Sequence, residues 1–182
     1  KAHAMATTLD PSPDTAPGKP KLRGWLHLGM APVVQLAGLV LLVVTPTVIG
    51  RLGLAVYLVA ATILFGTSAL YHRGHWSTKA AALLRRLDHA TIFVFIAGTY
   101  TPFTLIGLRG PIGWWMFGAI WTLALAGVIF KLFYTGRFKR LSTLIYIAMG
   151  WMIMVAAKPM LAALDGWTLG WLLAGGLSYT LG

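Results

Sequence analysis

The stretch Leu52–Tyr71, LGLAVYLVAATILFGTSALY, runs for 20 residues without a charged side chain. A helix of about 20 apolar residues is long enough to cross the hydrocarbon core of a bilayer. The stretch therefore predicts a transmembrane helix, and similar runs elsewhere predict an all-α, polytopic transmembrane bundle with six spans. The predicted spans are Leu26–Val44, Leu52–Tyr71, Leu87–Ile106, Ile112–Phe130, Leu141–Ala157 and Trp167–Leu181.

The composition supports a membrane protein and narrows its chemistry. Hydrophobic residues make up 58% of the 182 residues and charged residues only 10%, whereas soluble domains carry about 25% charged residues. This composition excludes a soluble enzyme. The chain has no cysteine, which excludes a disulfide framework, a zinc-thiolate site and a cysteine nucleophile. Histidine and carboxylate remain as the good metal ligands.

The 15 Lys and Arg residues exceed the four acidic residues, for a formal net charge of +11. Four basic residues precede the first apolar run, and the five connections that follow carry one, four, one, four and one. Cytoplasmic loops are enriched in Lys and Arg, so this alternation predicts a cytoplasmic N-terminus in a multi-pass protein of the cell inner (plasma) membrane. We expect the basic loops to meet anionic membrane lipids and expect no nucleic-acid partner.

The two ends of the chain differ from the apolar middle. Residues 1–22 are rich in proline and small polar residues, which predicts a disordered cytoplasmic tail, and residues 1–4 resemble a tag remnant before Met5. Residues 23–182 form the predicted transmembrane domain. The last run is the shortest and stops at Gly182 without a basic flank. We therefore expect the sequence to be cut off before a further helix.

One acidic residue lies at a predicted span. Asp88 stands at the start of the third apolar run, in Arg85-Arg86-Leu87-Asp88-His89. Ionisable side chains at membrane depth are costly, and they mark functional sites. The alternative interpretation is an acid at a helix N-terminus, stabilised by the helix dipole and by a nearby arginine.

A serine and a histidine lie close to this acid in the predicted topology. Ser68 and His72 are four residues apart, which places them on one face of the second helix. That helix ends, and the next begins, on the same side of the membrane. Ser68, His72 and Asp88 are therefore predicted to share one depth, with His27 of the first span at a similar depth.

Histidine and carboxylate together suit Zn²⁺, which takes three protein ligands in most catalytic sites. His72 and Asp88 fall at least one ligand short. His75 is predicted to lie in the loop beyond the second span. His89 directly follows Asp88, so it points about 100° away around the helix and is expected to line an adjacent interface.

The motifs around Ser68, His72 and Asp88 resemble those of a known family. Ser68-x-x-x-His72, Leu87–Phe93 (LDHATIF) and Ile96–Phe103 (IAGTYTPF) resemble the hemolysin III family, the bacterial branch of the progestin and adipoQ receptor (PAQR) superfamily. The resemblance extends from about Lys21 onward and includes His27.

The resemblance implies seven transmembrane helices and a zinc ion near the cytoplasmic side. It implies that His72 is a direct ligand, that Asp88 holds the zinc-bound water, and that Ser68 lies in the same site. The remaining two ligands would come from a His-x-x-x-His motif on the seventh helix. This sequence has no such motif, so these ligands are expected beyond Gly182.

Two functions fit these predictions. In the first, the protein is a zinc-dependent hydrolase of a lipid amide or ester, with Asp88 and Ser68 as catalytic residues. In the second, it is a non-enzymatic regulator of membrane lipid or energy homeostasis with structural zinc. A cytolytic or channel protein and a proton transporter are less favoured. A secreted cytolysin would need a soluble form, which the composition does not allow. A proton relay would need acids or histidines in spans four to six, where the sequence has none.

Small residues recur at four-residue spacing in the fourth span, at Gly118, Thr122 and Ala126. Small residues let helices approach closely in membranes. They are compatible with packing inside one chain and with a homo-oligomer.

Overall fold

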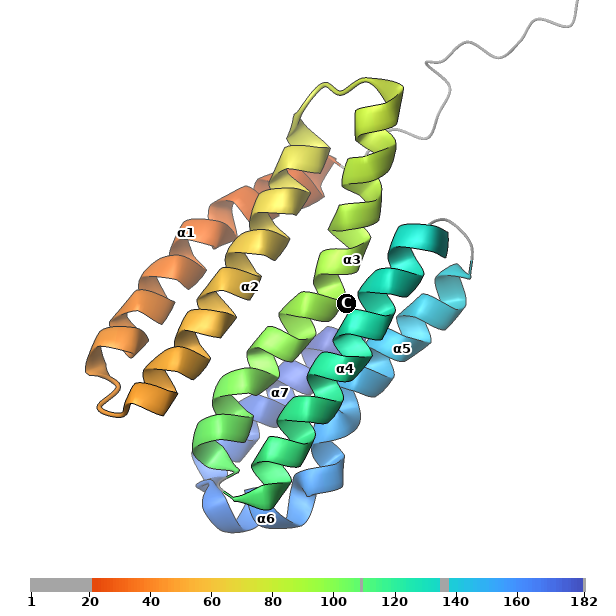
Figure 1. Ribbon diagram of the computed structural model, residues 1–182. Helices are drawn as coiled ribbons and strands as arrows, with labels where there is room; N and C mark the ends of the chain where they lie inside the picture. The colour runs from red at the N-terminus through yellow and green to blue at the C-terminus, as the bar shows by residue number, and fades with distance from the viewer. Residues whose placement is uncertain (1–20, 109, 135–137, 182) are drawn as a thin grey trace, which may run out of the picture.

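A computed structural model of the chain describes residues 21–108, 110–134 and 138–181. Helices account for almost all of these residues (Figure 1). The elements are α1 (Lys21–Val44), α2 (Val48–Arg73), α3 (Thr78–Pro102), the π-helical turn η2 (Phe103–Gly107), α4 (Pro111–Tyr134), α5 (Lys139–Trp151), the 3₁₀ turn η3 (Met152–Ala156), α6 (Ala157–Ala163) and α7 (Gly166–Leu181).

The long helices run up and down beside one another, with α3 in the middle of the bundle (Figure 1). The hairpin of α1 and α2 lies on one flank of α3, and α4 and α5 lie on the other. Half of the apolar stretch of α3 is buried, against 6% of that of α1. The polar residues on α2 and α3 are thus held in the best-packed part of the fold.

Five of the predicted spans form helices that are long and apolar enough to cross a membrane. They cover Gly24–Val44, Val48–Arg73, Thr78–Gly107, Pro111–Tyr134 and Arg140–Ala163. The sixth predicted span forms α7, whose 16 residues fall short of the roughly 20 that a straight crossing needs. The polytopic helical fold is confirmed, while the count of six and the cytoplasmic N-terminus stay predictions. The predicted tail lies outside the described residues up to residue 20, and residues 21 and 22 already belong to α1.

The third helix begins earlier than its apolar run. The run starts at Leu87, but α3 starts at Thr78, after Ser77, whose side chain accepts a hydrogen bond from the amide of Ala80 (3.4 Å). The added turns contain alanine, leucine, lysine and arginine, which are strong helix formers and need no apolar environment. Hydropathy therefore predicted a helix here but placed its start nine residues too late.

A short connection fixes the register between α2 and α3. The amide of Gly74 donates to the carbonyl of Leu70 (3.1 Å), and the indole Nε1 of Trp76 donates to the same oxygen (2.9 Å). These two bonds close the last turn of α2. Because α3 then begins at Thr78, the end of α2 faces the early turns of α3.

The fifth span is interrupted. Its helix changes from α5 to the 3₁₀ turn η3 and then to α6. The hydroxyl of Tyr100 on α3 compensates for the interruption, because it donates to the carbonyl of Gly150 (2.7 Å) and accepts from the amide of Ile153 (2.9 Å). Backbone groups released from a helix inside a bilayer require such partners.

The start of α7 is capped by Asp165. Its Oδ1 accepts a hydrogen bond from the amide of Thr168 (2.7 Å). Hydrogen bonds from Thr168 hold the pKa of this exposed carboxyl below its usual value. Asp165, the other acid in the described part of the chain besides Asp88, therefore has a structural role as a helix cap.

The small residues at four-residue spacing in α4 do not lie on the face that packs inside the chain. Gly118, Thr122 and Ala126 all face outward, and no atom lies within 4 Å of the position that a Gly118 Cβ would take. The close approach occurs instead at Gly127, where a Cβ would lie 2.4 Å from the ring of buried Phe93 on α3. The spacing of small residues alone did not identify the buried face of the helix.

This difference predicts opposite responses to two alanine substitutions. Gly127→Ala would force Phe93 out of a filled position, and such overpacking costs typically about 1–3 kcal/mol. Gly118→Ala on the same helix adds a methyl group to open space and serves as the matched control. We expect thermal unfolding in detergent to show a lower midpoint for Gly127→Ala only. Equal midpoints for the two variants would contradict the packing of α3 against α4.

Candidate functional site

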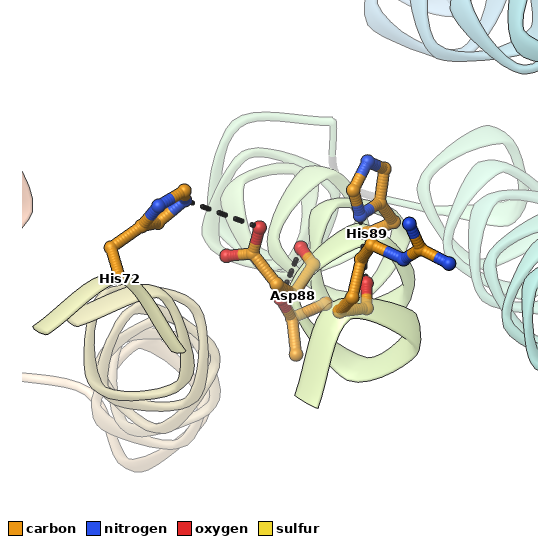
Figure 2. A network of polar contacts seen from close by, with 5 residues as sticks. His72, Asp88 and His89 are labelled. Atoms are coloured by element: carbon orange, nitrogen blue, oxygen red, sulfur yellow. Dashed lines mark hydrogen bonds and ion pairs between the residues drawn. The ribbon is translucent and has the colours of Figure 1, made fainter. Parts of the chain in front are cut away.

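The candidate site is built on His72, in the last turn of α2, and Asp88 on α3. Figure 2 shows the two side chains pointing toward one another from neighbouring helices. The Nε2 atom of His72 lies 3.7 Å from Oδ2 of Asp88, and the side chains are 4% and 7% exposed. This separation is longer than a hydrogen bond. A buried imidazole and a buried carboxylate thus face one another without direct bonding between these two atoms.

Asp88 lies inside its helix and not at the helix end. Because α3 begins at Thr78, about three helical turns precede Asp88. The stabilisation of an acid by the helix dipole falls off within the first turn, so the interpretation of Asp88 as a helix-terminal acid is wrong. The side chain that faces the Asp88 carboxylate is His72, where that interpretation expected an arginine.

Ser68 lies one turn before His72 on α2 and is completely buried. Other hydroxyls in these helices, such as those of Thr62 and Thr122, donate to the carbonyl four residues earlier. The Ser68 Oγ makes no hydrogen bond within the part of the chain that the structure describes. Buried polar groups are nearly always hydrogen-bonded, so this hydroxyl is suited to a ligand at the site.

Helix α1 closes one side of the site. A Cβ at Gly24 would lie 2.9 Å from the Cβ of His72, so the absence of a side chain lets α1 pack against this turn of α2. His27, one turn further along α1, packs edge-on against Phe65 with ring centroids 5.4 Å apart. Phe65 precedes Ser68 by three residues. His27 therefore lies beside the α2 face that carries Ser68. This position agrees with the prediction that His27 and Ser68 lie at a similar depth.

The two other histidines near the site lie outside it. His75 is in the loop after α2 and is exposed. The Nδ1 of His89 lies 2.7 Å from the carbonyl oxygen of Arg85, and its ring points away from the His72 and Asp88 pair (Figure 2). This orientation agrees with the predicted position of His89 at an adjacent interface.

The fifth span contributes a residue that sequence reasoning missed. The hydroxyl of Tyr146 on α5 donates a hydrogen bond to the carbonyl of His89 (2.8 Å). His89 is the residue that follows Asp88 in the chain. Its ring packs against Phe93 with centroids 4.6 Å apart. A tyrosine in the interior of an apolar run was the available signal, because a buried hydroxyl needs a partner.

The donors at the site suit zinc in kind but fall short in number. Imidazole nitrogen and carboxylate oxygen are both zinc ligands in proteins, and these atoms of His72 and Asp88 lie 3.7 Å apart. Zinc sites use three or four protein ligands. Among residues 21–108, 110–134 and 138–181, no group of three or more histidine and acidic side chains could hold a metal ion. The zinc site expected from the resemblance therefore stays a prediction.

Comparison with known proteins identifies the family. The model of the family described as "Haemolysin-III related" matches residues 16–182. The chain belongs to the hemolysin III family. Hemolysin-3 of Bacillus cereus is 43% identical over 158 residues, which cover 85% of this chain and 72% of that protein. The Hemolysin-3 homolog of Bacillus subtilis is 42% identical over 125 residues, which cover 68% of this chain and 58% of that protein.

A more distant relative supports the link of the hemolysin III family to the PAQR superfamily. The human monocyte to macrophage differentiation factor is 29% identical over 134 residues, which cover 70% of this chain and 54% of that protein. The chain thus spans just over half the length of the human relative. No solved structure matches the chain significantly. The family resemblance expected from Ser68, His72 and the segments after Asp88 is confirmed.

Proposed function

We propose that this hemolysin III protein binds Zn²⁺ directly through His72 and through water at Asp88, and that it hydrolyses an amide or ester bond of a membrane lipid. The observation that carries the proposal is the buried pair itself: an imidazole and a carboxylate 3.7 Å apart on adjacent helices of a membrane protein. Ionisable groups at membrane depth are expensive and are retained for function. Ser68, buried one turn away, adds a hydroxyl to the same site.

Each residue has a distinct role in this proposal. His72 holds the metal through its imidazole. Asp88 accepts a proton from the attacking water, and Ser68 donates a hydrogen bond to the oxygen on which charge develops. When bound, Zn²⁺ would lower the pKa of a coordinated water to about 7. The family resemblance implies two further histidine ligands on a seventh helix, and we include them in the proposal for the complete protein.

The position of the site favours a lipid substrate. His72 and Asp88 lie within helices that are long and apolar enough to cross the membrane. Aromatic rings continue from the pair along the two helices, where Phe65 of α2 packs against Phe95 of α3 with centroids 6.1 Å apart. A substrate that enters from the bilayer would place its acyl chain against such rings and its polar linkage near the pair.

The proposal includes an orientation. With a cytoplasmic N-terminus, the end of α2 and the start of α3 lie at the cytoplasmic face of the inner membrane. Arg73 lies directly after His72 and stacks over the ring of Trp25 on α1 at 3.8 Å from its centroid. Basic and aromatic residues together are typical of a membrane interface.

Metal removal tests the proposal. The protein expressed from its complete reading frame is purified in detergent and incubated with lipid amides and esters. We expect release of free fatty acid, loss of that release after treatment with a zinc chelator, and recovery with Zn²⁺ but not with Mg²⁺. Release that persists after complete zinc removal would contradict a metal-dependent hydrolase.

A further inference from the structure

The turn of α3 that carries Asp88 is held from two sides. On one side, His72 of α2 faces the Asp88 carboxylate. On the other side, Tyr146 of α5 donates its hydroxyl proton to the carbonyl of His89, at 2.8 Å. Because His89 follows Asp88 directly, this bond acts on the backbone that determines where the carboxylate lies.

Two tyrosines link α3 to the fifth span, and only one of them is close to Asp88. Tyr146 reaches from α5 to the carbonyl of His89, whereas Tyr100 reaches from α3 to the carbonyl of Gly150. His89 and Tyr100 are 11 residues apart, which corresponds to about 16 Å along a helix. The Tyr100 bond therefore ties the same two spans together far from the site.

The surroundings of Tyr146 fix its orientation. Its ring lies against Phe93, one turn after His89, with centroids 4.6 Å apart. Phe93 is fully buried and is packed from α4 by Gly127. The Tyr146 side chain is therefore held both by ring packing and by its hydrogen bond.

We propose that Tyr146 is a positioning residue for the site: through the carbonyl of His89 it holds the Asp88 carboxylate opposite His72. This inference rests on the proposed metal site and adds a residue from a third helix to it. Residues that orient metal ligands from outside the ligand shell typically change metal affinity by about 10–100-fold when they are replaced. We expect an effect at the lower end, about tenfold, because Tyr146 acts through the backbone.

The test compares Tyr146→Phe with Tyr100→Phe in the protein from the complete reading frame. Both variants keep an aromatic ring. Tyr146→Phe removes one phenol hydrogen bond between α3 and the fifth span and Tyr100→Phe removes two, so Tyr100→Phe is a stringent control for bonds lost between these spans. Two readouts are taken: Co²⁺ affinity and absorption spectrum in detergent, and hydrogen exchange of the α3 amides after Asp88. A general loss of stability would move both variants alike.

We expect Tyr146→Phe to weaken Co²⁺ binding about tenfold, to alter the Co²⁺ spectrum, and to speed exchange around Asp88, while Tyr100→Phe does none of these. Unchanged exchange around Asp88 in Tyr146→Phe would overturn the inference, with or without a metal. Faster exchange with unchanged Co²⁺ affinity would overturn it too. If the parent binds no Co²⁺ or Zn²⁺, the proposed metal function fails, and with it the positioning role toward a metal. Hydrogen exchange then shows separately whether the Tyr146 hydrogen bond restrains the backbone around Asp88.

Discussion

Asp88→Asn should reduce lipid hydrolysis by about 10²- to 10⁴-fold, the contribution that a positioned general base commonly makes. Asparagine has nearly the same shape as aspartate but cannot accept the proton of the attacking water. The zinc content at saturating Zn²⁺ should stay at the parental level, because His72 remains as the direct ligand. The expected signature is a folded, zinc-loaded and inactive protein.

The measurement pairs fatty-acid release with zinc content for the parent, Asp88→Asn and Asp165→Asn. Asp165 is exposed and caps α7, so its variant controls for the loss of one carboxylate. Full hydrolysis by Asp88→Asn with zinc in place would refute the role of Asp88 as a base. A zinc-loaded parent that hydrolyses no lipid would favour the non-enzymatic regulator, in which zinc ties helices together and contributes to folding.

His72→Ala should abolish tight zinc binding. His72 supplies the single imidazole that faces Asp88 among the described residues, and a zinc site deprived of one of its few ligands loses most of its affinity. Alanine is compatible with the last turn of α2, so the bundle should remain folded. We expect the bound metal to fall from about one ion per chain to near none.

His75→Ala is the matched control for this loss. His75 lies three residues after His72 but is exposed in the loop, so its removal should leave zinc affinity at the parental value. Affinity is measured by competition with a chromophoric chelator, and helicity by circular dichroism. Equal affinities for the two variants, with both proteins folded, would mean that the metal binds elsewhere.

The central juxtaposition of the site could be predicted from the sequence. The apolar run Leu52–Tyr71 placed Ser68 and His72 at the end of one helix, and alternating topology placed Asp88 beside them. The structure brings His72 and Asp88 together through the short connection after Gly74. Such predictions succeed because span length and loop length leave few ways to arrange consecutive helices.

Other features depended on contacts that hydropathy does not encode. The start of α3 at Thr78 follows from a serine cap and helix-forming residues outside the apolar run. The interruption of the fifth span is stabilised by Tyr100, 50 residues earlier in the chain. Tyr146 acquires its role only when α5 packs against α3. Each of these features arises from long-range packing or from capping, and neither leaves a periodic signal.

The most direct test is the zinc-edge X-ray absorption spectrum of the protein from the complete reading frame, recorded beside that of His72→Ala. We predict that the parent holds zinc with nitrogen and oxygen ligands and shows imidazole scattering. In His72→Ala, we predict that the zinc is lost or that this scattering falls by one imidazole. Absence of zinc from the folded parent, or identical spectra for the two proteins, would contradict a zinc site at His72 and Asp88.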